Sequence, residues 1–141
     1  MLAQRRLTEV QLWKKLAARG YDDDEIENAV ESCKANGYVD DRLYAALYVE
    51  GVRKAVGDAR LCADLIKRGI DRDAALTIVA EAPLDEHGRI TAAYEKIRRI
   101  QPQLHYASIA RKLERLGFPS SLIYRVLRER AAVDLQSFST G

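Results

Sequence analysis

Glycine and proline are scarce in this sequence, with 8 and 3 among 141 residues, too few for a sandwich or barrel that turns at every strand end. Long hydrophobic runs are also lacking, and none approaches the ~20 residues that span a bilayer. The stretch from Met1 to Arg6 is not the apolar segment of a signal peptide. Apolar residues make up 48% of the chain and charged residues 31%, as in globular proteins. We therefore expect a cytoplasmic, all-α protein with no membrane contact.

Cysteine and histidine occur only twice each, which limits redox and metal chemistry. Cys33 and Cys62 have no C-x-x-C motif, so two reduced thiols are favoured over a redox switch. His87 and His105 lack the spacing of metal ligands, and we expect both at exposed helix ends. Phosphate-loop and nucleophile-elbow motifs are missing as well. We therefore expect a protein that is no enzyme and has no cofactor and no metal site.

The acidic run from Asp22 to Glu25 is the one candidate for a cation site. An EF-hand loop would need a glycine at its sixth position and a glutamate at its twelfth, where this chain has Glu27 and Cys33. Capping of a helix N-terminus explains the same residues with fewer assumptions.

A segment with one spacing occurs three times in the chain. Two apolar residues four positions apart are followed four residues later by a glycine and then by a large apolar residue. This spacing predicts a helix with one apolar face, a left-handed glycine that ends it, and an apolar side chain folded back on the core. The three copies are Leu12–Tyr21, Leu61–Ile70 and Ile109–Phe118.

A second helix should follow each copy, and a third helix should follow in the first two copies. Residues 42–54 and a stretch that ends near residue 100 supply these third helices, whereas the last copy leaves room only for a short, frayed or absent one. We predict a single domain, 1–141, of three-helix repeats at 5–54, 55–101 and 102–141, which stack and share a continuous apolar seam. The predicted N-caps of the second helices are Asp22 or Asp24, Asp71 or Asp73, and Ser120 or Ser121.

The small net charge of +2 hides an uneven distribution. Residues 1–50 carry a net −3, residues 51–100 a net +2 and residues 101–141 a net +3. Basic side chains recur at helical spacing toward the C-terminus, which suits a phosphate backbone or an acidic protein groove. On charge alone, a solvated helical surface is the simpler explanation. The candidate partner-binding residues are Arg98, Arg99, Arg111, Lys112, Arg115, Arg125 and Arg128.

Three aromatic residues allow two interpretations each. Trp13 lies one residue off the first apolar stripe, and a place at the edge of the core is favoured over a role as partner anchor. Tyr44 and Tyr48 are four residues apart, and either an exposed strip or packing between repeats explains them.

Four stretches of the chain resemble the RecX family of regulators of the RecA recombinase. The first is similar to the family's R-x-x-[ST]-x-x-E-L-x-x-K-L start, with Gln11 where the family usually has glutamate. The second and third, a G-Y-V-D-D corner and a G-x-x-x-L-x-x-x-L-x-x-x-G-I segment, are the most specific. The stretches are Arg5–Leu16, Gly37–Ala45, Gly57–Ile70 and Arg115–Phe118.

The resemblance implies three-helix repeats stacked into a curved, elongated array, and a non-enzymatic function. That function is binding to the RecA filament and inhibition of its ATPase, strand-exchange and co-protease activities in DNA recombination, repair and the SOS response. We expect a monomer, and contact with single-stranded DNA within or beside the filament stays open. The alternative is direct nucleic-acid binding by a basic helical surface. A scaffold for an unrelated partner is a third hypothesis.

Overall fold

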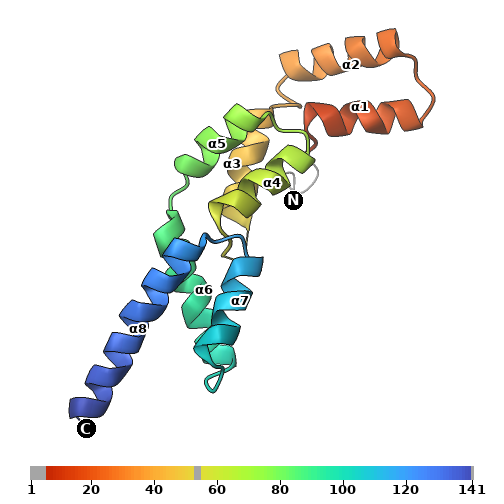
Figure 1. Ribbon diagram of the computed structural model, residues 1–141. Coiled ribbons are helices and arrows are strands. Elements are labelled where there is room, and N and C mark those ends of the chain that lie inside the picture. The colour runs from red at the N-terminus through yellow and green to blue at the C-terminus, as the bar shows by residue number, and fades with distance from the viewer. Residues whose placement is uncertain (1–5, 53–54, 141) are drawn as a thin grey trace. The chain divides into compact units, whose positions relative to one another are not determined.

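The computed structural model describes residues 6–52 and 55–140, with side chains described up to residue 133. Within these ranges the chain forms eight helices and no strand (Figure 1), which confirms the all-α class. No helix of the described part is both long enough and apolar enough to cross a membrane. The helices are α1 (Glu9–Ala18), α2 (Asp23–Ala35), α3 (Asp41–Gly51), α4 (Asp58–Lys67), α5 (Arg72–Ala80), α6 (Glu86–Ile100), α7 (Tyr106–Arg115) and α8 (Ser120–Thr140).

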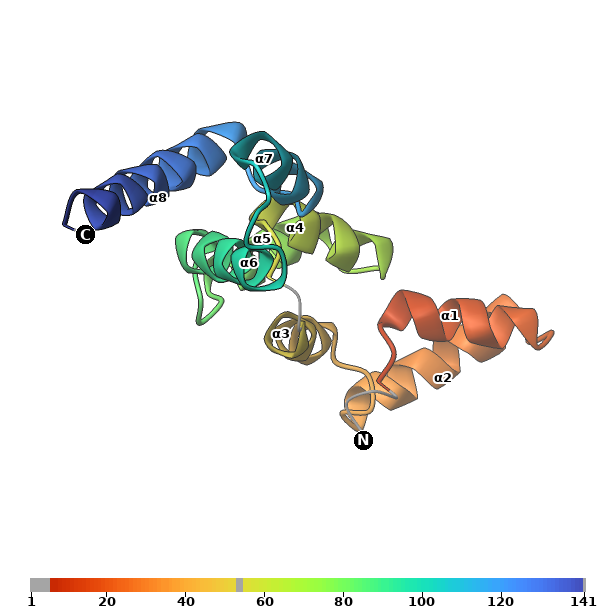
Figure 2. The same cartoon turned by 90° about the horizontal axis from the view of Figure 1, so that it is seen from below.

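The chain divides into two compact units. The first unit, Met1–Val52 with Cys62–Ala82, holds α1, α2, α3, most of α4, and α5. The second unit, Arg53–Leu61 with Pro83–Gly141, holds the first turn of α4 together with α6, α7 and α8. In the first unit α1 packs on α2, which Figure 2 shows side by side, and α3 packs on α5. In the second unit α6, α7 and α8 pack on one another. These units do not follow the repeats 5–54, 55–101 and 102–141, so that division stays a proposal, as does the curved, elongated shape.

Three helices end at a left-handed glycine, as the repeated spacing predicts. Gly20, Gly69 and Gly117 have φ values of 92°, 101° and 91°. At each one the glycine N–H donates to the carbonyl three residues back, and the next N–H donates to the carbonyl five residues back. These two bonds satisfy the last carbonyls of α1, α4 and α7. Gly37, with φ 75°, ends α2 with the same pair of bonds.

The apolar residues after these glycines do not all reach the core. Ile70 and Phe118 are each 3% exposed, but Tyr21 is 49% exposed, so the prediction that Tyr21 folds back on the core is wrong. A Cβ added at Gly69 would strike the side chain of a neighbouring segment, whereas one added at Gly20 would meet nothing within 4 Å. No described segment therefore covers the corner at Gly20.

Aspartates start the helices that follow the corners. Asp22 and Asp71 are the N-caps of α2 and α5, as predicted. One carboxylate oxygen of Asp22 accepts from the Glu25 N–H at 2.8 Å, and the Glu25 carboxylate accepts from the Asp22 N–H at 3.2 Å. The acidic run is thus the start of a helix. The predicted helix at 42–54 is α3, capped by Asp40, and residues 53 and 54 lie outside the described residues.

The last predicted cap is wrong. Helix α8 begins at Ser120, so Ser120 and Ser121 lie inside its first turn. The carbonyl of Pro119 accepts the first helical hydrogen bond, from the Ile123 N–H at 3.0 Å. Because α8 continues unbroken to Thr140, the described part of the third copy contains two helices.

The start of one helix packs against a glycine corner in each unit. In the first unit the Thr8 hydroxyl, fully buried before α1, donates to the Arg68 carbonyl at 2.6 Å beside the α4–α5 corner. The Gln11 side chain accepts from the Thr8 N–H at 3.0 Å and completes a capping box, so glutamine performs the task expected of glutamate. In the second unit the Gly57 N–H, before α4, donates to the Leu116 carbonyl at 2.8 Å beside the α7–α8 corner.

Candidate protein-binding surface

Arg89, in the first turn of α6, holds the segment that enters α4. This arginine is 8% exposed, and its guanidinium donates to the carbonyls of Val56 at 2.6 Å and Leu84 at 3.0 Å. It also forms an ion pair with Asp58, whose N–H donates to the Glu86 carboxylate at 2.6 Å. A buried cation needs such a full set of partners. These bonds fix the first turn of α4 against α6.

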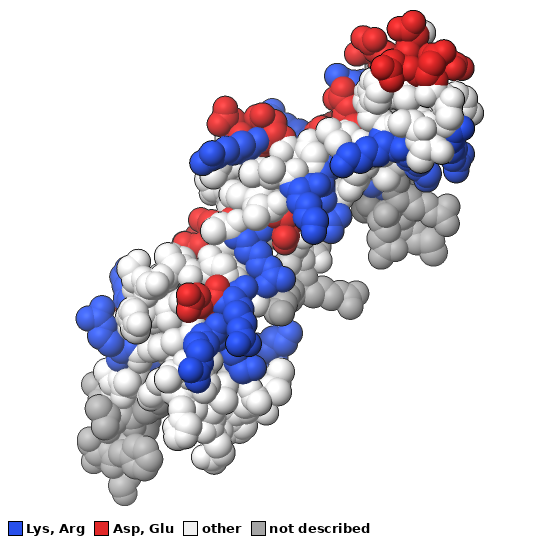
Figure 3. Space-filling view, turned by 45° about the vertical axis from the view of Figure 1, so that its right-hand side comes forward, with Lys and Arg blue, Asp and Glu red and all other residues white. Residues whose placement is uncertain are grey.

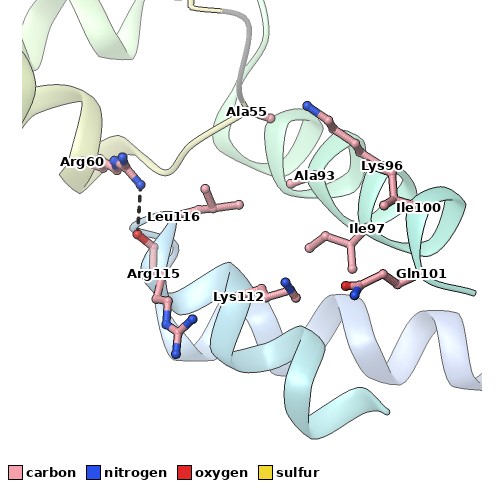
Figure 4. A pocket seen from close by; sticks show the side chains of 10 residues that line it. All are labelled: Ala55, Arg60, Ala93, Lys96, Ile97, Ile100, Gln101, Lys112, Arg115 and Leu116. Atoms are coloured by element: carbon pink, nitrogen blue, oxygen red, sulfur yellow. Dashed lines mark hydrogen bonds between the residues drawn. The ribbon is translucent and has the colours of Figure 1, made fainter. Parts of the chain in front are cut away.

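A hollow of about 310 Å³ lies in the second unit between α6, the end of α7 and the first turn of α4 (Figure 4). Its apolar floor comes from Ala93, Ile97 and Ile100 of α6 and from Leu116 after α7. Ile97 and Leu116 point into the space between the two helices. Ile100 is 66% exposed. An open apolar floor of this kind is typical of binding sites.

Basic residues surround this floor. Lys112 of α7 points into the hollow toward Gln101 at the end of α6, and Lys96 lies along the opposite edge in Figure 4. Arg60 of α4 donates to the carbonyl oxygen of Arg115 at 3.2 Å, the dashed line in Figure 4. The described residues that line the hollow include no acidic one. The hollow therefore combines an apolar floor with positive charge at its rim.

The structure places the seven predicted residues differently. Lys112 and Arg115 line the hollow. Arg125 forms an ion pair with Glu129 at 3.4 Å, with both side chains mostly exposed, and such pairs contribute little to stability. The predicted residues that are exposed outside the hollow are Arg99, Arg111, Arg125 and Arg128.

Arg98 turns inward and holds the loop between α6 and α7. Its guanidinium donates to the carbonyls of Leu104 at 2.8 Å and Pro102 at 3.1 Å and to the Tyr94 hydroxyl at 3.2 Å. It also lies 5.0 Å from the centroid of the Tyr106 ring. The hydrogen bond with Tyr94 raises the pKa of Arg98. Arg98 thus positions the two helices that line the hollow.

Arg60 and Lys96 are lining residues that the sequence reasoning missed. Lys96 lies four residues before Ile100, and this spacing, which puts a cation beside an apolar residue on one helix face, could have signalled it. Arg60 belongs to a different helix, and it lies here because hydrogen bonds hold the first turn of α4, and the segment before it, against α6 and the end of α7.

Charge is unevenly spread over the surface. Figure 3 shows Asp and Glu gathered over α2, whereas Lys and Arg are spread over the face in view. The first turn of α2 alone carries three acidic residues, Asp23, Asp24 and Glu25. This acidic turn contributes to the net −3 of residues 1–50.

In the first unit, Tyr44 and Tyr48 of α3 pack on α4. The Arg68 guanidinium donates to the Tyr44 hydroxyl at 2.9 Å and lies 4.4 Å from the centroid of the Tyr48 ring. The Tyr48 hydroxyl donates to Asp64 at 3.3 Å. Burial, with the nearby Asp64 charge, raises the pKa of Tyr48 above its ordinary value. Packing, and not an exposed strip, therefore explains these tyrosines. Trp13 is half-buried, as expected at the edge of a core.

Comparison with known proteins shows relatives over most of the chain. The chain is 34% identical over 119 residues to the regulatory protein RecX of Thermus thermophilus, which covers 84% of this chain and 79% of that protein. It is 32% identical over 123 residues to the regulatory protein RecX of Vibrio campbellii, with the same two shares. No family model matches the chain.

Two solved structures share the fold. The crystal structure of RecX from Lactobacillus salivarius matches with a TM-score of 0.76 at 19% identity, over 91% of this chain and 88% of that one. A second crystal structure, of a regulatory protein RecX, matches with a TM-score of 0.73 at 21% identity, over 91% of this chain and 66% of that one. The predicted all-helical fold is thus found in both.

Proposed function

We propose a function from one premise: the chain belongs to the RecX family of regulatory proteins. The protein binds the nucleoprotein filament of the RecA recombinase and inhibits its ATPase, strand-exchange and co-protease activities in DNA recombination and repair. It acts in the cytoplasm as a monomer, through protein contacts instead of catalysis, and it needs no cofactor.

The similarity to a RecX protein over 119 residues carries this proposal. The exposed cations of the second unit support it, because a filament assembled on DNA presents phosphate charge that attracts a basic surface. The acidic first turn of α2 would be repelled by the same charge, so the second unit is the part that docks.

Affinity for RecA filaments on single-stranded DNA tests the proposal. The variant reverses three exposed arginines outside the hollow, so that it leaves the hollow's lining intact. Exposed charges at the edge of an interface set the rate at which the two partners meet. We therefore expect about a tenfold loss of affinity for the filament, and this loss should fade at high salt. The substitutions are Arg111→Glu, Arg125→Glu and Arg128→Glu.

A matched control separates local charge from net charge. It reverses three exposed arginines of the first unit, Arg19→Glu, Arg42→Glu and Arg72→Glu, and should bind as the unchanged protein does. Equal losses in the two variants would contradict docking through the second unit. Binding to bare single-stranded DNA as tight as binding to the filament would favour the alternative, a direct nucleic-acid-binding protein.

A further inference from the structure

We propose that the hollow of the second unit is a docking site for an acidic protein segment that carries one large apolar side chain. The inference rests on the proposed function in one respect, that the recombinase supplies the segment. The rest of the inference follows from the composition of the hollow, because its floor and its rim would bind two different chemical groups that lie close together.

The rim of the hollow is positively charged and would bind negatively charged groups. Arg60, Lys96, Lys112 and Arg115 all line the hollow, and none of the described lining residues is acidic. The carboxylate next to Lys96 in sequence belongs to Glu95, and it forms an ion pair with Arg130 of α8 at 2.9 Å. The positive charge of the rim therefore has no lining carboxylate to balance it, and carboxylates of a partner would complement it.

The floor of the hollow is apolar and would bind an apolar side chain. Ile100, which lines the hollow, is 66% exposed, so a partner side chain laid against it would remove apolar surface from water. The volume of about 310 Å³ is at the lower end of the range of about 300–1,000 Å³ for ligand pockets. This size suits one anchoring side chain and its backbone better than a large cofactor.

A peptide fits the hollow better than a nucleic acid does. Proteins that hold single strands stack the bases on aromatic side chains, and the described residues lining the hollow include no aromatic one. A phosphate backbone would meet the four cations but leave the floor of Ile97, Ile100 and Leu116 without an apolar partner. An acidic segment with an apolar anchor uses both parts.

Fluorescence anisotropy with a defined probe tests the inference on the full chain. The probe is a short fluorescein-labelled peptide in which glutamates flank one phenylalanine. The double variant Lys96→Glu/Lys112→Glu should bind it at least about tenfold more weakly. The matched control Lys14→Glu/Lys15→Glu, which reverses two exposed lysines of α1, should bind it unchanged.

A second pair of changes tests the anchor separately from the charge. Ile100→Ser removes an apolar side chain from the floor of the hollow. Because Ile100 is mostly exposed, the fold should persist, and circular dichroism would verify this. Ile100→Ser should weaken binding of the phenylalanine peptide several-fold. Binding of a peptide with alanine in place of phenylalanine should not change, because Ile100 would contact only the phenylalanine side chain.

Three results would overturn the inference: equal losses in the two lysine variants, no loss in either, or the same effect of Ile100→Ser on both peptides. Oligothymidylate that displaces the peptide and binds more tightly would assign the hollow to nucleic acid instead. If the peptide binds as expected while the unchanged protein does not bind RecA filaments, the docking site is supported and the proposed function is refuted.

Discussion

Replacing Gly57 with alanine tests the close approach of the segment before α4 to the α7–α8 corner in the second unit. The added Cβ would collide with the carbonyl of Gly117 and lie 2.7 Å from the backbone nitrogen of Phe118. Because these are backbone atoms, the two segments must separate, and the hydrogen bond from the Gly57 N–H to the Leu116 carbonyl is lost. Overpacking costs about 1–3 kcal/mol and the hydrogen bond about 0.5–1.5 kcal/mol. We expect the free energy of unfolding to fall by about 2–4 kcal/mol.

Two other glycines separate this collision from the other effects of adding a methyl group. Gly20 has φ 92° and open space around it, so Gly20→Ala should cost only the backbone strain of about 1–2 kcal/mol. Gly51, the last residue of α3, has open space and no left-handed φ. Gly51→Ala should therefore be neutral or stabilise the protein by up to about 1 kcal/mol.

Urea unfolding followed by far-ultraviolet circular dichroism measures all three variants, because helix is lost from the whole chain. The expected order of stability is Gly51→Ala, then Gly20→Ala, then Gly57→Ala. A Gly57→Ala protein as stable as the Gly51→Ala protein would refute the close packing of the α4 start against the α7–α8 corner.

Two further predictions concern the first unit. Gly69→Val should cost about 2–5 kcal/mol in urea unfolding, because φ is 101° and the new Cβ would lie 2.5 Å from the Cβ of Val10; a neutral result would refute the packing of α1 on this corner. Because the folded state raises the pKa of Tyr48, the unfolded state loses that proton first, so stability should hold below about pH 10 and fall as pH rises further. Tyr48→Phe should flatten this fall in urea titrations between about pH 9 and pH 11, and an identical slope would show that Tyr48 is not its source.

The helix ends could be predicted from sequence because they depend on few neighbouring residues. Gly69 and Gly117 each satisfy the last carbonyls of their own helix, and Asp22 caps the helix it precedes. Burial after the corners could not be predicted in the same way. Tyr21 occupies the position of Ile70 in the repeat, yet its exposure depends on whether another segment packs over the corner.

For the same reason, only part of the lining of the hollow could be predicted from the sequence. Lys112 and Arg115 are neighbours on α7 and follow from helical spacing. Arg60 joins them only because the buried Arg89 binds the segment that enters α4. Arg98 shows the converse, since its charge suggests an exposed contact but its hydrogen bonds hold the loop after α6. Charge along a sequence does not reveal which cations the fold itself uses.

The claim that this chain regulates RecA is tested most directly by ATP hydrolysis. RecA filaments assembled on single-stranded DNA are titrated with the unchanged protein, and the rate of ATP hydrolysis is measured at each concentration. We expect the rate to fall as the protein is added. About tenfold more of the triple variant Arg111→Glu/Arg125→Glu/Arg128→Glu should be needed for the same inhibition. A rate that stays constant at protein concentrations equal to those of RecA would contradict this claim.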